Sequence, residues 1–221
     1  YATAITGKLM EINPFDEPNV TEAKEATARL LNQFRETGKL PAHEHAFAEN
    51  GVKLYADEKM LRLLSELSLQ HNYSSGDLTG MLAAFINSTR AGDYFSVQAY
   101  LPMSPQITGT LEEVRRRMRH ITRRAVTIGF GPRFLHSTGQ LHKGGPNTGS
   151  FIQITCDDEH DLAIPGEPFS FGTLKAAQAA GDLEALRAKD RRALRLHVSG
   201  DIVKGIGILL RAIDLVDARR K

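Results

Sequence analysis

From about residue 78 to residue 216, stretches with the hydrophobic period of a helix alternate with stretches that have the period of a strand. Strands are expected at Tyr94–Leu101, Ala125–Phe130, Ser150–Thr155 and Leu194–Val198. Helices are expected at Leu78–Ala91, around Leu111–Ile121, at Ser170–Ala180, in a short stretch from Asp182, and at Asp201–Val216. Strands separated by helices usually pair in parallel, with helices on both faces. The alternation therefore predicts an α/β fold, a three-layer sandwich with a mainly parallel or mixed sheet.

The first 45 residues predict a helical segment that precedes this sheet. Two prolines disfavour regular structure before Thr21, which is a suitable N-cap for a helix that Gly38 and Pro41 end. A polar stretch from Pro41 to Asn50 follows. After it we expect a short strand at Val52–Ala56 and a helix capped by Asp57. We therefore predict two units, residues 1–45 and residues 46–221.

Composition and charge exclude several classes of partner. The chain has 28 basic and 26 acidic residues, and a net charge of +2 gives no reason to expect nucleic acid or an anionic membrane surface. No stretch reaches the roughly 20 apolar residues that cross a bilayer. The single cysteine, Cys156, can form no internal disulfide, which is typical of a cytoplasmic protein. The chain starts at Tyr1, so we expect a piece of a longer polypeptide.

No cofactor or metal motif is present in the sequence. The run Gly129–Phe134 lacks the third glycine of a dinucleotide-binding loop, and the residues before Lys143 do not match a P-loop. His136 and His142 are spaced unusually for helical metal ligands and have no cysteine or carboxylate between them. We therefore predict neither a bound cofactor nor a metal site.

Lys24 is the first candidate for a functional residue. Counted from Thr21, it would lie in the first turn of its helix, where a cation is disfavoured by the helix dipole by about 0.3–1 kcal/mol. It precedes Leu31 by seven residues and so shares a helix face with it. Two interpretations stay open: the lysine stem covers the core while its amine reaches solvent, or the amine serves an anionic or oxygen-rich substrate.

The second candidate is the glycine-rich segment between the second and third predicted strands. Residues 131–149 form a loop longer than a strand connection needs, and such loops often carry function. Its donor side chains could gather around an anion; they are Arg133, Ser137, Thr138 and Lys143. The alternative is that the loop packs against a neighbouring domain and that these groups satisfy its backbone.

Two segments resemble a known family. The run Phe15-Asp16-x-x-x-Val20-x-x-x-Lys24, preceded by Gly7-x-Leu9, resembles the C-terminal signature of phosphoglucose isomerase, which ends in an active-site lysine. The chain departs from that signature at Glu17, Asn19 and Thr21, where the family has Gln, Gly and Glu. The segment Gly131–Gly149 is similar to the C-terminal extension of bifunctional transaldolase/phosphoglucose isomerases.

The resemblance implies a fragment of a glucose-6-phosphate isomerase. Residues 1–45 would be the tail of the sugar-isomerase domain with the lysine helix, and residues 46–221 an additional C-terminal α/β domain. The enzyme interconverts glucose 6-phosphate and fructose 6-phosphate through an enediol(ate), a step of glycolysis and gluconeogenesis. Lys24 would be catalytic, whereas the family's glutamate base and histidine would lie upstream. The fragment alone would then be inactive.

The partners implied are a sugar phosphate and the upstream domains of the same polypeptide. Arg133, Ser137, Thr138 and Lys143 would be substrate-binding residues if the glycine-rich segment meets the sugar phosphate. The competing interpretation is a non-catalytic module, in which the α/β core assembles a homo-oligomer or binds a sugar phosphate in a pocket of its own.

Overall fold

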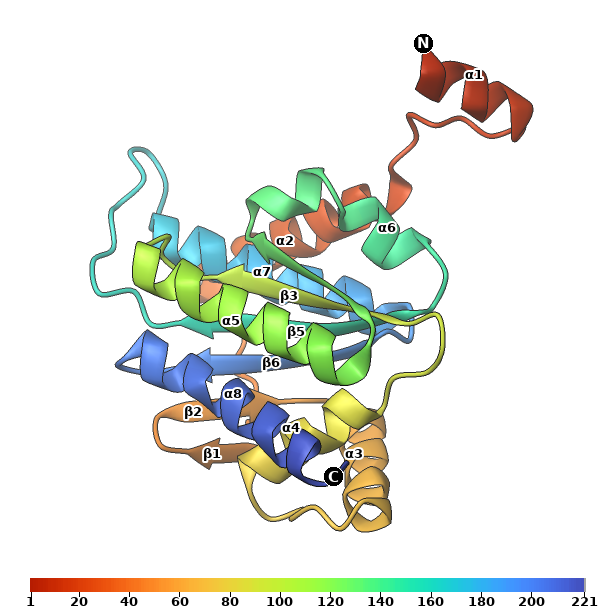
Figure 1. Ribbon diagram of the computed structural model, residues 1–221. Coiled ribbons are helices and arrows are strands. Elements are labelled where there is room, and N and C mark those ends of the chain that lie inside the picture. Colours follow the sequence, from red (N-terminus) through yellow and green to blue (C-terminus); the bar gives the residue numbers. More distant parts are fainter. Residues whose placement is uncertain (221) are drawn as a thin grey trace.

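A computed structural model of the chain describes residues 1–220 (Figure 1). Its strands are β1 (Phe47–Glu49), β2 (Val52–Tyr55), β3 (Tyr94–Tyr100), β4 (Ala125–Phe130), β5 (Gly149–Cys156) and β6 (Arg192–Val198). Its helices are α1 (Ala2–Leu9), α2 (Pro18–Thr37), α3 (Glu58–Gln70), α4 (Leu78–Asn87), α5 (Pro105–Thr122), the 3-10 helix η1 (Arg133–His136), α6 (Gly139–Gly144), α7 (Phe171–Ala188) and α8 (Ile202–Ala218). Within this described part, no helix has the length and apolar character that crossing a membrane requires.

All six strands belong to one sheet, in the order β1-β2-β6-β5-β3-β4. The neighbours β6, β5, β3 and β4 run parallel, whereas β1 and β2 add an antiparallel edge next to β6. The four strands expected from the alternating pattern therefore lie in a single sheet, as predicted. The sheet is mixed, because a hairpin needs no crossover helix and can extend a parallel sheet at its edge.

Helices cover both faces of this sheet, which confirms the predicted sandwich. Alternate strand residues such as Val97, Ile152 and Leu196 pack with α3, α4, α5 and α8 in the largest apolar core. Their strand neighbours point to the opposite face, where Phe151 packs against α7 and Tyr100 against η1. On that side α2 packs against α7 and α6 (Figure 1).

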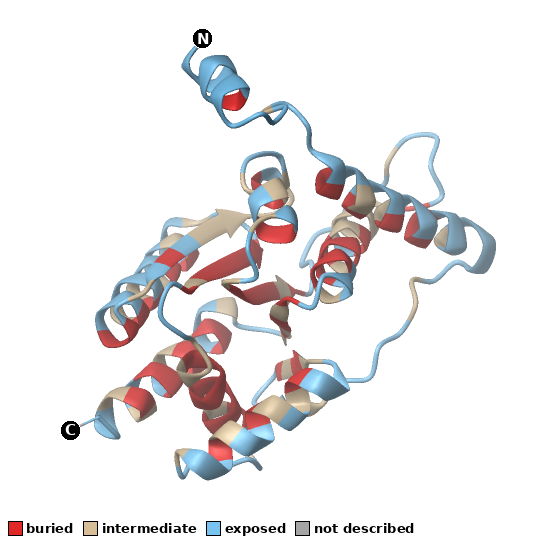
Figure 2. Cartoon of the chain, turned by 90° about the vertical axis from the view of Figure 1, so that its right-hand side faces the viewer, coloured by how far each residue is buried: buried red, intermediate tan, exposed pale blue. Residues whose placement is uncertain are grey.

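The N-terminal segment differs from expectation at its start. Helix α2 begins at Pro18, with Glu17 as N-cap, and not after a Thr21 cap. Proline suits the first helical position because its fixed φ is helical and the amide hydrogen it lacks would be unpaired there. Gly38 ends the helix with φ 71°, as predicted. Figure 2 shows α1 set apart from the rest of the chain and exposed along most of its length.

Strand β1 lies inside the polar stretch from Pro41 to Asn50, for which no strand was predicted. It pairs with β2 through a two-residue turn in which Asn50 (φ 48°) and Gly51 (φ 77°) both have positive φ. An Asn-Gly pair is the strongest short signal for such a hairpin, because both residues tolerate this backbone conformation. The signal was therefore present in the sequence, and the few apolar residues before it hid the strand.

Two further expectations were wrong. Helix α7 is continuous from Phe171 to Ala188, so no break separates Ala180 from a short helix at Asp182. Both Gly181 and Asp182 are buried, which keeps them inside the helix despite their poor helical propensity. The segment 131–149 is not a structureless loop either, because it contains η1 and α6.

The close approach of α2 to α7 at Gly181 gives a test of the fold. A Cβ atom on Gly181 would lie 3.0 Å from the backbone nitrogen of Thr27, whereas one on Gly109 in α5 would meet nothing within 4 Å. We expect Gly181→Ala to lower the free energy of unfolding by about 1–3 kcal/mol, the range for overpacking. The control Gly109→Ala should raise it by up to about 1 kcal/mol. Urea denaturation measures both, and equal stabilisation by the two substitutions would contradict this packing.

Candidate functional site

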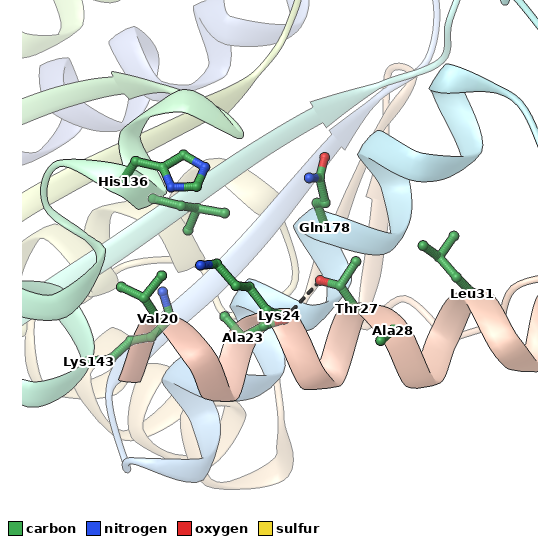
Figure 3. Close-up of a pocket in the computed structure, with 10 residues that line it drawn as sticks. Val20, Ala23, Lys24, Thr27, Ala28, Leu31, His136, Lys143 and Gln178 are labelled. Carbon is green, nitrogen blue, oxygen red and sulfur yellow. Dashed lines mark hydrogen bonds between the residues drawn. The ribbon is translucent and has the colours of Figure 1, made fainter. Parts of the chain in front are cut away.

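A cavity of about 280 Å³ lies where α2, the segment η1–α6 and α7 meet (Figure 3). Its walls are largely apolar, with Val20, Ala23 and Leu31 from α2 and Leu135 from η1. The polar side chains that line it are Lys24, Thr27, His136, Lys143 and Gln178. The cavity therefore combines apolar walls with a few polar groups, which is typical of small-molecule sites.

Lys24 extends along this cavity, and in Figure 3 its amine points toward His136. Because α2 begins at Pro18, the lysine lies in the second turn, where the helix dipole is weaker than in the first turn. The side chain is exposed, and it shares the cavity with Leu31, as the seven-residue spacing predicted. Within residues 1–220, Lys24 forms no ion pair. Its charge is thus available to a ligand.

Lys143 of α6 also lines this cavity, but its amine is already paired with another side chain. Its Nζ forms an ion pair with Oδ1 of Asp182 in α7, and both side chains have no solvent exposure. Burial raises the pKa of the Asp182 carboxyl, an effect that the Lys143 ammonium opposes. Such a pair loses hydration on both sides, so its net stabilisation is small while both partners are present, but removal of one partner is costly.

The sheet presents polar residues beneath this ion pair. Gln98 of β3 and Gln153 of β5 are register neighbours and are fully buried. Gln153 donates to the carbonyl of Ala179 (2.9 Å), and Nε2 of Gln98 lies 3.4 Å from Nδ1 of His142. Oδ2 of Asp182 and the hydroxyl of Tyr100 have no hydrogen-bond partner in the described chain. Burial and the Asp182 carboxylate hold the pKa of Tyr100 well above its usual value, so the phenol stays neutral.

His142 is the buried histidine of this layer. Its ring lies among aromatic rings, with the Phe151 centroid 5.2 Å away and those of Tyr94 and Phe134 each 6.1 Å away. Burial, together with the adjacent Lys143 ammonium, lowers its pKa to about 4. His142 is therefore neutral at pH 7.

The other predicted ligands of the glycine-rich segment do not converge. Arg133 is exposed and lies 3.8 Å from the sulfur of Met103. The hydroxyls of Ser137 and Thr138 both donate to the carbonyl of Phe134 (3.0 and 3.4 Å). These hydrogen bonds satisfy a backbone carbonyl of η1. The alternative interpretation of the segment expected its polar side chains to satisfy its own backbone in this way. Of the predicted site residues, the structure brings together Lys24 and Lys143.

Sequence reasoning missed His136, Gln178 and Asp182 as members or supports of this site. His136 was considered only as a metal ligand and rejected as one, and Asp182 only as the start of a short helix. No local signal marks Gln178, which reaches the cavity because α7 packs on α2. If residues 171–188 are read as one helix, Asp182 occupies a position that faces the core. An acidic residue at such a position indicates that it has a buried partner.

The cavity suits a ligand that is rich in oxygen and carries or develops negative charge. Lys24 supplies a cation, while His136 and Gln178 supply an imidazole and an amide. No carboxylate is among the described residues that line it, so a proton acceptor other than His136 would have to come from outside them. No group of three or more metal-ligating side chains occurs among residues 1–220.

Comparisons with known proteins give a likeness of fold. No family model and no curated protein matches this chain. Among solved structures, the chain is similar to a hypothetical protein, TT0462, from Thermus thermophilus, with a TM-score of 0.56 and 15% sequence identity. The match covers 73% of this chain and 45% of that one, so it spans less than half of that protein. At this identity the similarity concerns the fold alone.

The Lys143–Asp182 pair can be tested by removing one charge and then both. We expect Lys143→Met to lower the free energy of unfolding by about 3–5 kcal/mol at neutral pH, because it leaves a buried carboxylate unpaired. Combining it with Asp182→Leu should recover most of that loss. In the single variant the loss should shrink as the pH falls, since burial raises the pKa of Asp182 and the protonated form carries no charge. Urea denaturation at pH 5 and pH 8 measures this, and a double variant as unstable as the single would contradict it.

The lowered pKa of His142 predicts that the folded chain loses stability in mild acid. Between its folded pKa of about 4 and an unfolded value near 6.5, the unfolded chain binds a proton that the folded chain does not. Stability should therefore fall with decreasing pH in this window, by at most about 1.4 kcal/mol per pH unit from this group. His142→Asn should reduce this slope in unfolding measurements from pH 4.5 to 7. His120→Asn, at an exposed histidine, is the matched control, and an equal reduction of the slope in both variants would contradict the role of His142.

Proposed function

We propose that this chain is part of a glucose-6-phosphate isomerase, joined upstream to the remaining sugar-isomerase domains and to a transaldolase. The observation that carries the proposal is the position of Lys24. The lysine that closes the phosphoglucose-isomerase-like run lines a cavity, and its amine has no ion-pair partner in the described chain. A lysine that merely covered the core with its stem would not require such a cavity.

The chemistry of the isomerisation suits a cation at this position. A general base removes the proton from the carbon next to the substrate carbonyl, and an enediol(ate) forms. Return of a proton to the neighbouring carbon then gives the other sugar. Negative charge develops on the substrate oxygens in between, and an ammonium group placed near them stabilises that charge. Lys24 fits this role, whereas the glutamate base of the family would come from upstream residues.

The upstream domains of the same polypeptide are the partner that this proposal requires. Apolar side chains on the N-terminal segment support such a contact, because Ile5, Leu9, Met10 and Phe15 are each more than half exposed. A cluster of this kind is typical of a surface that another domain covers. We also propose a cytoplasmic location, since the single cysteine, Cys156, is free and buried.

A second candidate is a non-catalytic module formed by residues from about Gly51 to Val216, which would bind a sugar phosphate or assemble a homo-oligomer. The observation that favours it is the separate core between the sheet and α3, α4, α5 and α8, which includes no residue of α2. This part of the chain also lines cavities that do not involve Lys24.

The isomerase proposal is tested by substitution of Lys24 in the full-length enzyme. We expect Lys24→Ala to lower kcat by about 10²-fold, the scale for one positioned electrostatic group, with a small change in KM for fructose 6-phosphate. Lys24→Arg should retain part of the activity. Lys39→Ala, an exposed lysine after α2, is the control and should leave kcat unchanged.

The same assay applied to the isolated chain tests where the base lies. Residues 1–221 alone should convert no fructose 6-phosphate above background. Turnover by the isolated chain would show that the base lies within it, and full activity of the Lys24→Ala enzyme would overturn the role of the lysine.

A further inference from the structure

A second cavity, of about 370 Å³, lies at the carboxyl ends of the parallel strands. Tyr100 ends β3, Thr155 and Cys156 end β5, and all three line it. The chain leaves β3 toward β4 on one side and leaves β5 toward β6 on the other. In open α/β sheets, ligands bind at the carboxyl edge where the strand order reverses in this way. Residues 40–43, which we call the strap, contribute to the cavity from the connection between α2 and β1.

Basic side chains gather on this part of the sheet. Lys53 of β2 is the register partner of His197 of β6, and Tyr55 is the partner of Arg195. The guanidinium of Arg195 lies 4.2 Å from the centre of the Tyr55 ring, and its Nε has no hydrogen-bond partner in the described chain. Lys53 and Arg195 are therefore diagonal neighbours on adjacent strands, a spacing that long side chains can span, so both can contact one anion.

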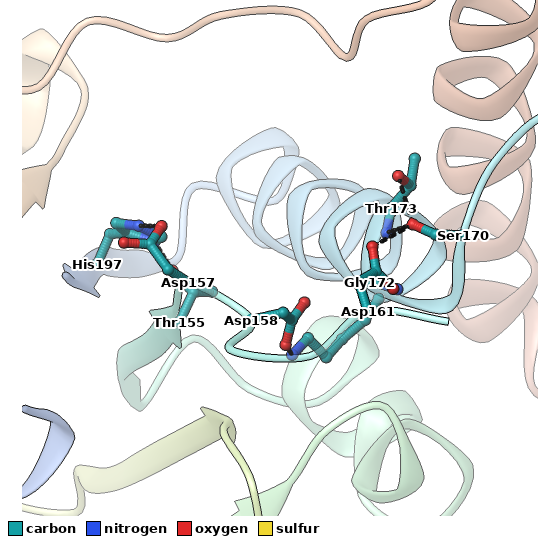
Figure 4. Close-up of polar contacts among 9 residues, drawn as sticks. Thr155, Asp157, Asp158, Asp161, Ser170, Gly172, Thr173 and His197 are labelled. Atoms are coloured by element: carbon teal, nitrogen blue, oxygen red, sulfur yellow. Dashed lines mark hydrogen bonds and ion pairs between the residues drawn. The ribbon is translucent and has the colours of Figure 1, made fainter. Parts of the chain in front are cut away.

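The nearby acidic side chains are already paired with other groups. Figure 4 shows His197 between two partners: its Nε2 lies 3.0 Å from Oδ1 of Asp157, and its Nδ1 lies 3.0 Å from the Thr155 hydroxyl. Asp158 forms an ion pair with Lys175. Burial would raise the pKa of Asp157, but hydrogen bonds from Ser199 and His197 outweigh it and lower the pKa, so this group is a carboxylate at pH 7.

Two cations in this cavity form no close ion pair, although the Asp157 carboxylate attracts Lys53 from a greater distance. Neither Arg195 nor Lys53 forms an ion pair with any of residues 1–220. Burial lowers the pKa of Arg195, although the group remains charged at pH 7. A cation that is partly removed from water and lacks a carboxylate costs free energy, which a bound anion recovers.

We infer that this cavity between the strap and the carboxyl ends of β3 and β5 binds a phosphate monoester, held by Arg195 and Lys53. A phosphate monoester carries a charge of about −1.5 to −2 at pH 7, which matches two cations better than a carboxylate does. The guanidinium can donate two parallel hydrogen bonds to phosphate oxygens, while the ammonium acts as a point charge. When Asp157 accepts a hydrogen bond from Nε2 of His197, Nδ1 of that ring accepts one from the Thr155 hydroxyl. The Thr155 oxygen can then accept a hydrogen bond from a hydroxyl of the ligand.

This site is independent of the proposed isomerase site. Lys24 does not line the second cavity, and Arg195 and Lys53 do not line the first. A phosphate monoester that is no isomerase substrate therefore separates the two. We choose glycerol 3-phosphate as the probe, with glycerate as its carboxylate analogue and glycerol as its uncharged analogue.

Titration calorimetry on the chain of residues 1–221 provides the test. We expect saturable binding of one glycerol 3-phosphate, at least about tenfold tighter than glycerate, and none of glycerol. Arg195→Met and Lys53→Met should each weaken binding by about tenfold or more, the scale for a hydrogen bond to a charged group. Lys24→Ala should bind as the unchanged chain does, and so should Lys204→Met, which removes an exposed lysine on α8.

Thermal melting separates a binding role from a structural one. Without ligand, Arg195→Met should melt no lower than the unchanged chain, because it removes a half-buried cation that forms no ion pair within the described residues. Glycerol 3-phosphate should raise the melting temperature of the unchanged chain and of Lys24→Ala, but not of Arg195→Met. If Arg195→Met does not fold, Lys53→Met decides, since Lys53 is only half-buried.

Several results would overturn the inference. These are the absence of saturable binding, equal affinity for glycerate, or unchanged affinity in the Lys53→Met and Arg195→Met variants. Loss of binding in Lys24→Ala would place the probe in the first cavity instead. Because the isomerase assay depends on Lys24 and this binding does not, either proposal can fail while the other stands.

Discussion

The ion pair between Lys143 and Asp182 joins the two parts of the chain that build the first cavity. It connects α6 to α7 with no solvent exposure on either side chain, and Arg191 holds the same segment by donating to the Lys143 carbonyl (2.5 Å). Since both charges have lost their hydration, α6 can hardly leave α7 without leaving a charge unpaired. Helix α2 packs against both of these helices, so the position of Lys24 depends on this pair.

One face of the sheet contributes the core that stabilises the fold, and the other face contributes the two cavities. The face toward α3, α4, α5 and α8 carries apolar side chains such as Phe95, Ile154 and Leu196, and it forms the largest core. The opposite face carries buried polar groups such as Gln98, beside His142 of α6, and Gln153, which donates to α7. Both cavities open on this polar side. Buried polar groups cost free energy unless they are paired. Cations that form no ion pair on such a face therefore indicate a ligand.

The approach of α2 to α7 relates the two proposals to each other. A glycine at position 181 lets the helices meet closely, and that contact puts Lys24 over the cavity while α2 leads through Gly38 into the strap. The single segment of residues 18–43 thus contributes to both cavities. The division of the chain at residue 45 stays a prediction, but this segment packs on the α/β core whichever domain it belongs to.

The sequence by itself determined the fold class, because period-2 and period-3.6 patterns report directly on which side chains face the core. It also placed Lys24 and Leu31 on one face, a local property of any helix. It did not determine that Lys143 is buried against Asp182, or that Arg195 and Lys53 line one cavity without forming an ion pair in the described chain. Those facts depend on residues about 40 to 140 positions apart, and only the packing of α6 on α7 and the pairing of β2 with β6 decide which charges meet.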